Sequence, residues 1–358
     1  MTHPQIALIV SGFPRRSETF ALNELHALAA RGLLAGIFAT KPGDGLLPQP
    51  GGESLLDYVR MVPPGDAPTQ AAWITARLAG HAVQGVHGYF AHTPTEVAIQ
   101  VAQRLGVPFG FSVHAKDARK VAPAELTARA RAAACVIACN IDTVDYLRCN
   151  KAPVCLVPHG VDVRRFTPRP FPLDCPLRLL AVGRLVEKKG FNVLLEAVER
   201  LSLPFHLRII GDGPEYSRLT ENVRTLGLAE RVTLCSGRTH EELPAEYANA
   251  HLVVVPSVCD QTGDRDGLPN VVLEALASGR PVVASTVGAI TSVVINRENG
   301  LLFRPGDSSA LATALTSLAD QPTLRERYGQ KGRTRVERDY ALGSCTDRFC
   351  SVLEAVYA

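Results

Sequence analysis

Two acidic residues, Asp266 and Glu274, stand eight positions apart in the segment DGLPNVVLEALASGRPVVAS. The pattern predicts that Asp266 lies in a loop and that Glu274 lies about one turn into the helix that follows. A carboxylate offers several acceptor positions for hydroxyl donors. We therefore expect Glu274 to accept hydrogen bonds from a hydroxylated ligand such as ribose.

The same segment predicts a helix that begins at Pro269. Proline suits the first helical position because its missing N–H is one of the donors that have no partner there. The next N–H groups, those of Asn270 and Val271, point out of the helix end with a partial positive charge. An anion such as a diphosphate fits at that end, which indicates a nucleotide-sugar site. The alternative is that these residues only cap the helix.

Two cations follow another predicted strand, residues 177–182, in the segment GRLVEKKG. Arg184 and Lys189 lie in the turn that ends this strand, just before a helix. This turn and the start of the helix at 269–277 open on the same edge of the second domain. The two cations and the helix end could therefore neutralise one diphosphate. Each charge-assisted hydrogen bond contributes about 1.5–3 kcal/mol. A pair of ordinary surface cations is the other interpretation.

Two other phosphate-binding patterns are missing. The turn Gly211-Asp212-Gly213 lacks the third glycine of a dinucleotide fingerprint, because Tyr216 stands in its place. The chain has no GxxxxGK[ST] motif either. A nicotinamide site and a P-loop are therefore disfavoured.

In the first half, His114 and Asp117 follow an apolar strand in FSVHAKD, and Arg15 and Glu18 lie in the loop SGFPRRSET after the first strand. At the carboxyl ends of parallel strands these residues would face a common cleft. A lone histidine at a strand end can equally be structural. His159, in the segment PHGVD, is open to both interpretations.

Short apolar runs alternate with helical patterns along the chain, which favours α/β domains with parallel sheets. Predicted strands in the first half are residues 5–10, 33–39, 86–90, 108–113 and 135–139, with a helix at 20–31. In the second half we predict strands at 177–182, 206–210, 232–235, 252–256 and 282–284, and helices at 191–201, 215–226, 240–250, 269–277, 307–320, 323–338 and 344–357.

The length of 358 residues exceeds what one hydrophobic core usually supports, so two domains are expected. Four prolines in RRFTPRPFPLDCP, residues 164–176, mark a linker that we expect to act as a hinge. We assign residues 1–165 to the first doubly wound domain and 175–343 to the second. The last helix, about 344–358, is expected to pack back on the first domain.

Composition is ordinary for a globular protein, with 46% hydrophobic and 20% charged residues. The net charge of +3 is too small to argue for nucleic acid. No apolar run approaches a membrane span or a signal peptide. We read the nine cysteines, which form no CxxC pair, as reduced and mostly core residues, and as neither disulfides nor metal ligands. We therefore expect a cytoplasmic protein.

Basic residues gather in the first 131 positions. They are Arg15, Arg16, Lys116, Arg119, Lys120, Arg129 and Arg131. Such a cluster is compatible with an anionic membrane surface and also with a solvated face. Any membrane contact is therefore expected to be peripheral, at the inner membrane face.

Six segments, taken together, resemble one family. FPRRSETF, FSVHAKD, PHGVD, VGRLVEKKG, IIGDGP and DGLPNVVLEALASGRPVVAS stand in the order and spacing of the GT-B retaining glycosyltransferases of family 4, especially those of bacterial exopolysaccharide synthesis. The resemblance extends from the first strand to the last helix. It implies two Rossmann-like domains that face a central cleft, the first on the acceptor side and the second binding the donor.

The resemblance also implies a role for each matching residue. Arg184 and Lys189 would hold the donor diphosphate, Glu274 the ribose, and His114 a hydroxyl of the donor sugar. The remaining donor-side positions are Gly183, Gly237, Arg238, Gly267, Leu268, Pro269, Asn270 and Val271, and the acceptor side has Arg15, Glu18 and Asp117. The family usually carries glutamate where this chain has Asp266, which shortens the side chain at a predicted catalytic position by one methylene.

The implied activity is transfer of a sugar from a nucleoside diphosphate, with retention at the anomeric carbon, to a glycan or lipid-linked saccharide. A uridine donor is preferred by family likeness only. No metal ligand pair of the DxD type follows a strand, so we expect no metal and no other cofactor. A nucleotide-sugar epimerase, a glycan phosphorylase and a non-catalytic nucleotide-sugar-binding partner protein are the alternatives; the phosphorylase would need a pyridoxal phosphate lysine that we do not find.

Overall fold

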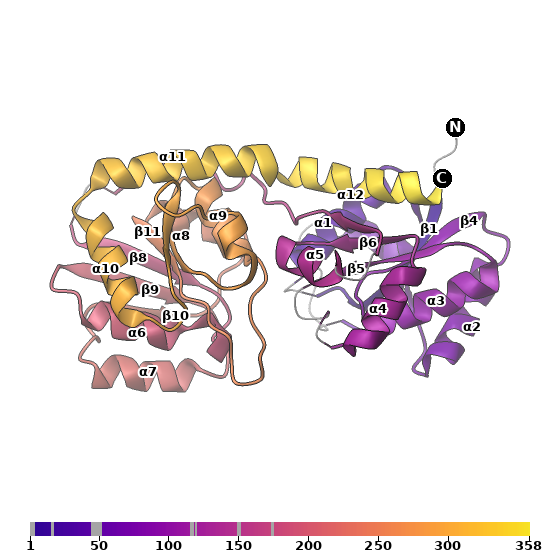
Figure 1. Ribbon diagram of the computed structural model, residues 1–358, viewed down its shortest axis with the longest axis horizontal. Coiled ribbons are helices and arrows are strands. Elements are labelled where there is room, and N and C mark those ends of the chain that lie inside the picture. The colour runs from indigo at the N-terminus through magenta and orange to yellow at the C-terminus, as the bar shows by residue number, and fades with distance from the viewer. Residues whose placement is uncertain are drawn as a thin grey trace. The chain divides into compact units, whose positions relative to one another are not determined.

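The computed structural model describes residues 4–15, 18–43, 52–114, 118, 120–148, 152–172 and 175–358. The chain divides into two compact units, each with its own sheet (Figure 1). Unit 1 comprises Met1–Gly160 and Gly343–Ala358, and unit 2 comprises Val161–Leu342.

Unit 1 has a seven-stranded sheet in the order β3-β2-β1-β4-β5-β6-β7, with every pair of neighbours parallel. Its strands are β1 (Gln5–Phe13), β2 (Leu34–Pro42), β3 (Val59–Met61), β4 (Val83–Gly88), β5 (Phe109–Val113), β6 (Cys135–Ala138) and β7 (Val154–Leu156). Its helices are α1 (Thr19–Ala30), η1 (Gly52–Tyr58), α2 (Ala67–Leu78), α3 (Thr93–Leu105), α4 (Pro123–Ala132), α5 (Ile141–Arg148) and α12 (Leu342–Tyr357).

Strand β1 shows why both faces of this sheet are covered. Its alternate residues Ile6 and Leu8 pack in one cluster with α1 and α12, whereas Ala7 and Ile9 pack in another with α2 and α3. A strand buried on both faces reads as a continuous apolar run, which is what parallel sheets require. The result is a doubly wound α/β unit.

Helix α12 completes unit 1 from the far end of the sequence. Phe349, Leu353 and Tyr357 are fully buried in the same cluster as Ile6 and Leu8. A Cβ atom at Gly85 of β4 would overlap the ring of Tyr357, so this position needs a glycine for space. The buried apolar side chains therefore hold α12 on the sheet.

Unit 2 repeats the plan with six parallel strands in the order β10-β9-β8-β11-β12-β13. The strands are β8 (Leu177–Val182), β9 (Phe205–Ile210), β10 (Val232–Cys235), β11 (Leu252–Val255), β12 (Val282–Ser285) and β13 (Gly300–Phe303). The helices are η3 (Glu187–Lys189), α6 (Phe191–Glu199), α7 (Tyr216–Thr225), α8 (Leu243–Ala248), α9 (Asn270–Ala277), η4 (Gly288–Ser292), α10 (Ser308–Ala319) and α11 (Pro322–Asp339).

The strands that the sequence analysis did not name are β3, β7 and β13. Each has three or four residues and lies at the edge of its sheet. An edge strand is covered on fewer sides than a central one, so it carries a weaker apolar signal. The two predicted parallel α/β folds are confirmed, with these strands added.

The proline-rich segment that we expected to be a linker packs on unit 2. Phe166 is fully buried in the cluster of α9 and α11, and Arg333 donates to the carbonyl oxygens of Phe166 and Val163 at 2.6 and 3.0 Å. The boundary between the units falls at Gly160, five residues before the predicted end of the first domain. A hinge spanning 164–176 would break these contacts.

Arg280 secures the next part of this segment. It is fully buried, and it donates to the carbonyl oxygens of Pro170, Ala248 and Tyr247 at 3.2, 2.8 and 2.9 Å. Its guanidinium also lies 4.3 Å from the ring centre of Phe171. Burial lowers the pKa of Arg280 to about 10, so the group remains charged at neutral pH.

We expect Arg280→Met to lower the free energy of unfolding of unit 2 by roughly 2–4 kcal/mol, because buried carbonyl groups lose their donors. Urea unfolding followed by circular dichroism measures the change. Arg224→Met is the matched control, since Arg224 is exposed and pairs with its neighbour Glu221 on α7. Equal midpoints for the two variants would contradict this role.

Candidate functional site

The predicted residues divide between the two units. His114, Arg15 and Glu18 lie in unit 1, and the donor-side residues all lie in unit 2. Asp117 falls outside the described residues.

Two loops meet at the carboxyl edge of the unit 2 sheet. One follows β8 and the other follows β11, and these two strands pair in parallel at the centre of the sheet. Strand β9, which follows β8 in the chain, lies on one side of β8, and β11 lies on the other side. Ligands of open α/β sheets bind at such a switch point. The predicted cationic turn and the predicted helix start therefore do open on one edge.

A glycine lets the two loops touch. Gly190 ends η3 with φ +66°, and a Cβ atom there would overlap the carbonyl oxygen of Pro256 in the other loop. The N–H of Val258 donates to the carbonyl oxygen of Lys188 at 2.8 Å. The backbone thus fixes the lysines of η3 against the loop that carries Asp266.

The side chains of this contact form a buried ion-pair network. Lys189 Nζ donates to Asp266 Oδ2 at 2.8 Å, and Ser257 Oγ donates to the same oxygen at 2.7 Å. Lys188 Nζ lies 3.2 Å from Asp264 Oδ2 and 3.7 Å from Asp266 Oδ1. Asp266 is only 8% exposed. Its two oxygens therefore face two ammonium groups and a hydroxyl.

Arg184 differs from the lysines. It is exposed, and no ion pair joins it to any carboxylate in the described ranges. Its charge is available to a ligand, whereas that of Lys189 is already balanced by Asp266. Gly183, which precedes Arg184, directly follows β8 and donates its N–H to the carbonyl oxygen of Ile210 at 3.0 Å.

Helix α9 begins at Asn270, one residue later than predicted, because Pro269 is its N-cap residue and not its first helical residue; Gly267 and Leu268 precede it. No side chain caps it. The N–H of Val272 donates to the carbonyl oxygen of Pro269 at 3.0 Å, while those of Asn270 and Val271 have no backbone acceptor in the described chain. Two half-exposed donors therefore remain at the helix end, where the dipole favours an anion.

Glu274 is 4% exposed and is held from two sides. Tyr247 donates its hydroxyl proton to Oε2 at 2.7 Å, and His240 Nε2 lies 3.2 Å from Oε1. Arg165 donates to Nδ1 of the same imidazole at 3.1 Å, so the proton of a neutral His240 is on Nε2 and points at Glu274. Burial and then the adjacent carboxylate raise the pKa of Tyr247 well above its usual value.

Gly237 and Arg238, which were predicted to lie on the donor side, follow β10. The N–H of Gly237 donates to Asp212 Oδ2 at 3.1 Å. Arg238 Nε lies 3.4 Å from Glu246 Oε1, a carboxylate that also receives two hydrogen bonds from Arg208. The backbone N–H and the Arg238 guanidinium are thus both engaged in this structure.

In unit 1, His114 lies among aromatic rings at the end of β5. The ring centres of Phe20, Phe90 and His159 lie 5.1, 4.9 and 5.1 Å from it. His159 Nδ1 contacts Glu24 Oε1 at 3.0 Å, and Tyr89 donates to the other oxygen of Glu24. The predicted catalytic histidine therefore adjoins a second histidine that is held by a buried carboxylate.

The charge state of His159 follows from this pair. Burial acts to lower its pKa, but the Glu24 carboxylate and the neighbouring Cys139 outweigh burial and raise the pKa to about 10.

Arg15 and Glu18, the other predicted residues of this unit, form an ion pair at 3.4 Å.

Several residues of these two clusters escaped the sequence analysis. They are Lys188, Tyr247, His240, Glu24 and Tyr89. Lys188 is adjacent to the predicted Lys189, so the EKKG run offered a signal. The others lie 27 to 135 positions from their partners, and no local pattern connects them.

Among the basic residues of unit 1 that the structure describes, Arg129 is engaged within the unit. Arg129 is largely buried, pairs with Glu125 and donates to the carbonyl oxygens of Ala91 and His92 at 2.6 and 3.1 Å. Lys120 and Arg131 are exposed, and Arg16, Lys116 and Arg119 lie outside the described residues. No helix within the described ranges is long and apolar enough to cross a membrane.

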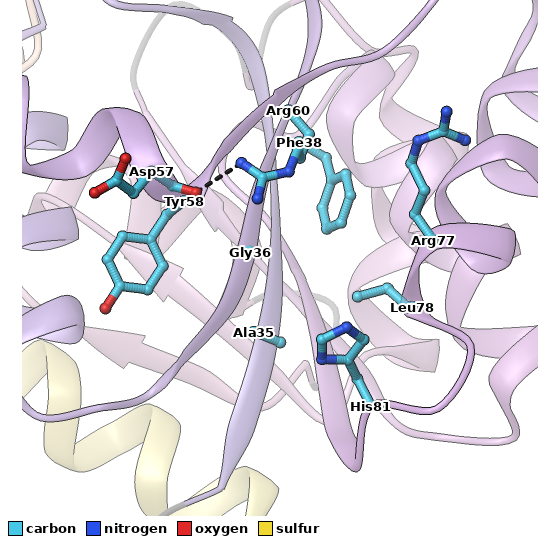
Figure 2. Close-up of a pocket in the computed structure, with 9 residues that line it drawn as sticks. All are labelled: Ala35, Gly36, Phe38, Asp57, Tyr58, Arg60, Arg77, Leu78 and His81. Atoms are coloured by element: carbon cyan, nitrogen blue, oxygen red, sulfur yellow. Dashed lines mark hydrogen bonds between the residues drawn. The ribbon is translucent and has the colours of Figure 1, made fainter.

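A cavity of about 420 Å³ in unit 1 holds none of the predicted residues (Figure 2). Ala35 and Gly36, near the start of β2, line it together with Arg60 and His81. It therefore lies toward the amino ends of the strands, away from the carboxyl edge that carries His114.

The lysine network makes a stability prediction. We expect Lys188→Met to lower the free energy of unfolding by about 1–3 kcal/mol, because the part-buried Asp264 carboxylate loses the ammonium group that lies 3.2 Å from it. The double variant Lys188→Met/Asp264→Asn should recover part of the loss, since it removes both charges. Urea unfolding of the wild type, the two single variants and the double variant measures these free energies. Lys331→Met, on the exposed face of α11, is the control. Strictly additive losses would exclude the pairing.

Comparison with known proteins assigns each unit. Residues 17–165 match the model of Glycosyltransferase Family 4, and residues 176–321 match that of Glycosyl transferases group 1. The chain is 31% identical over 213 residues to a putative colanic acid biosynthesis glycosyltransferase of Escherichia coli, covering 58% of this chain and 52% of that protein. It is 35% identical over 185 residues to an amylovoran biosynthesis glycosyltransferase of Erwinia amylovora, covering 51% and 46%. The chain thus spans about half the length of these curated relatives.

Solved structures match over the whole chain. A sucrose-phosphate synthase from Thermosynechococcus elongatus superposes with a TM-score of 0.83 and 24% identity, covering 99% of both chains. HepE of Anabaena in complex with UDP gives 0.82 and 17%, covering 98% of this chain and 100% of that one. These likenesses show the fold. With the two family matches, they place this chain among the glycosyltransferases of family 4 type that have the GT-B fold.

Proposed function

We propose that this chain transfers a sugar from a nucleoside diphosphate, preferably a UDP-sugar, to a glycan or lipid-linked saccharide in polysaccharide biosynthesis, with retention and without a metal. The observation that carries the proposal is the contact between the loop after β8, which carries Arg184 and Lys189, and the loop after β11, which leads into the open amino end of α9, at the switch point of the unit 2 sheet. A uridine donor is in keeping with HepE, whose structures hold UDP or UDP-glucose. A mannosyltransferase relative that depends on GDP-mannose keeps guanosine as the competing choice.

The leaving diphosphate defines the chemical task. Its negative charge grows as the bond from the anomeric carbon to the diphosphate oxygen breaks, and donors already fixed at that place stabilise it most. Arg184 is exposed and uncompensated, and the N–H groups of Asn270 and Val271 are open. These three groups would bind the diphosphate directly.

Lys189 and Asp266 would act as a pair. In the unliganded chain Asp266 neutralises Lys189 and fixes its ammonium group beside the α9 loop. A bound diphosphate would share that ammonium, while Lys188 and Ser257 continue to satisfy Asp266. We therefore assign to Asp266 the positioning of Lys189, because the aspartate side chain is short and its oxygens are already engaged.

Glu274 would bind the ribose. A carboxylate has about four acceptor positions, and Tyr247 and His240 occupy one on each oxygen. The remaining positions suit the two ribose hydroxyls. His114 would contact a hydroxyl of the donor sugar, and the acceptor oxygen would attack on the leaving-group face, passing its proton to the departing diphosphate oxygen.

Nucleotide binding tests the proposal first. We expect UDP and its sugars to raise the melting temperature most in a panel of nucleoside diphosphates and nucleotide sugars. Binding to the native state at 100 times the dissociation constant adds about 2.7 kcal/mol of stability. A panel in which no nucleotide shifts the melting curve would remove the basis of the proposal.

The cations supply a kinetic test. We expect Arg184→Ala and Lys189→Ala each to lower kcat by about 10²–10³, as loss of one fixed donor typically does. Arg200→Ala, an exposed cation on the same unit, should leave kcat unchanged. Circular dichroism confirms that each variant is folded, and full activity in both the Arg184 and the Lys189 variant refutes the assigned roles.

A further inference from the structure

Three side chains that commonly bind transition metals meet at the carboxyl edge of the unit 1 sheet. His114 directly follows β5, Cys139 directly follows β6, and His159 lies three residues after β7. These strands are neighbours and pair in parallel, so their carboxyl ends lie side by side. The topology, and no local sequence motif, brings the three residues together.

The spacing suits a single ion. One ligand atom from each residue, two imidazole nitrogens and the Cys139 sulfur, all lie within 4.8 Å of one another. The ring centres of His114 and His159 are 5.1 Å apart. Two imidazoles bound to the same tetrahedral zinc ion have ring centres about 5 Å apart, given zinc–nitrogen distances of about 2.0–2.1 Å. Small side-chain adjustments would close the set around an ion.

A buried carboxylate orients one of the ligands. Glu24 accepts from His159 Nδ1 at 3.0 Å, so the ion would bind at Nε2 and displace the proton there, because a histidine ligand binds in its neutral form. That Nε2 atom is buried and makes no hydrogen bond of normal geometry to the described residues. Tyr89 donates to the second oxygen of Glu24 and fixes the carboxylate in turn. Metal-binding histidines generally have such a carboxylate on their other nitrogen.

We propose that His114, Cys139 and His159 form a binding site for a zinc-class divalent ion, with a fourth position open to water or to an added ligand. Two imidazoles and one thiolate favour Zn²⁺ over Mg²⁺ or Ca²⁺, which prefer oxygen ligands. The three side chains are half-buried, and the imidazoles of His159 and His114 lie beside Phe20 and Phe90, which limits competition from water.

The site has a consequence for activity that rests on the proposed function. An ion on His114 would occupy the nitrogen with which this residue contacts the donor sugar. Zinc therefore acts as a reversible inhibitor of transfer, and the reaction itself needs no metal.

Cobalt substitution tests the site independently of activity. The protein is stripped with a chelator, dialysed and titrated with Co²⁺. We expect one ion per chain, with a thiolate-to-cobalt charge-transfer band in the near ultraviolet and the intense visible bands of tetrahedral cobalt. Addition of one equivalent of Zn²⁺ should abolish both.

Three variants locate the ion. Cys139→Ser should lose the charge-transfer band, whereas the matched control Cys155→Ser, a half-buried cysteine on β7, should keep it. Glu24→Gln should keep the band but weaken binding about 10- to 100-fold, because it alters the group that orients His159. A band that persists in Cys139→Ser, or no band in the wild-type protein, overturns the proposal. Melting curves confirm that each variant is folded.

Measuring transferase activity with and without Zn²⁺ distinguishes the proposed metal site from the proposed function. Stoichiometric Zn²⁺ should inhibit transfer by the wild-type protein, the chelator should restore it, and Cys139→Ser should be at least tenfold less sensitive relative to its own zinc-free rate. Cobalt binding without any transferase activity would leave the site intact and refute only the function. Loss of activity on chelation would show a required metal and overturn the inhibitory role.

Discussion

Parallel strand pairing is the constraint on which both candidate sites depend. Because every pair of neighbours in the two sheets is parallel, the carboxyl ends of the strands, and the loops that follow them, collect at one edge of each unit. In unit 2 this brings the loop with Lys189 to the loop with Asp266. In unit 1 it brings His114 to Cys139 and His159. Residues 25 to 77 positions apart become neighbours for this one reason.

Buried charge at these edges is compensated residue by residue. Asp266 faces two lysines, Glu274 faces a tyrosine and a histidine, and Glu24 faces a tyrosine and a histidine. An uncompensated buried carboxylate is strongly destabilising, so such partners are a condition of folding as well as of binding. Arg184 and the start of α9 are left open, and this asymmetry distinguishes the groups that can meet a ligand from those that hold them in place.

The two units differ in how far their chemistry is fixed by backbone contacts. In unit 2, Gly190 and the hydrogen bond from Val258 to Lys188 lock the two loops together before any side chain is considered. In unit 1, the edge cluster is held by side chains from α1, β5, β6 and the segment after β7. A metal ion would supply to that cluster the cross-link that the backbone supplies in unit 2.

The sequence by itself determined the alternation of strands and helices, the start of α9 next to a proline and the cations that follow β8, because these depend on local periodicity and turn chemistry. It could not determine the edge strands β3, β7 and β13, whose apolar runs are short. Only the tertiary structure decided that residues 164–172 pack on unit 2, that Asp266 is held by two lysines, and that Cys139 lies beside two histidines. Each of these results comes from contacts between distant positions, and such contacts leave no periodic trace in the chain.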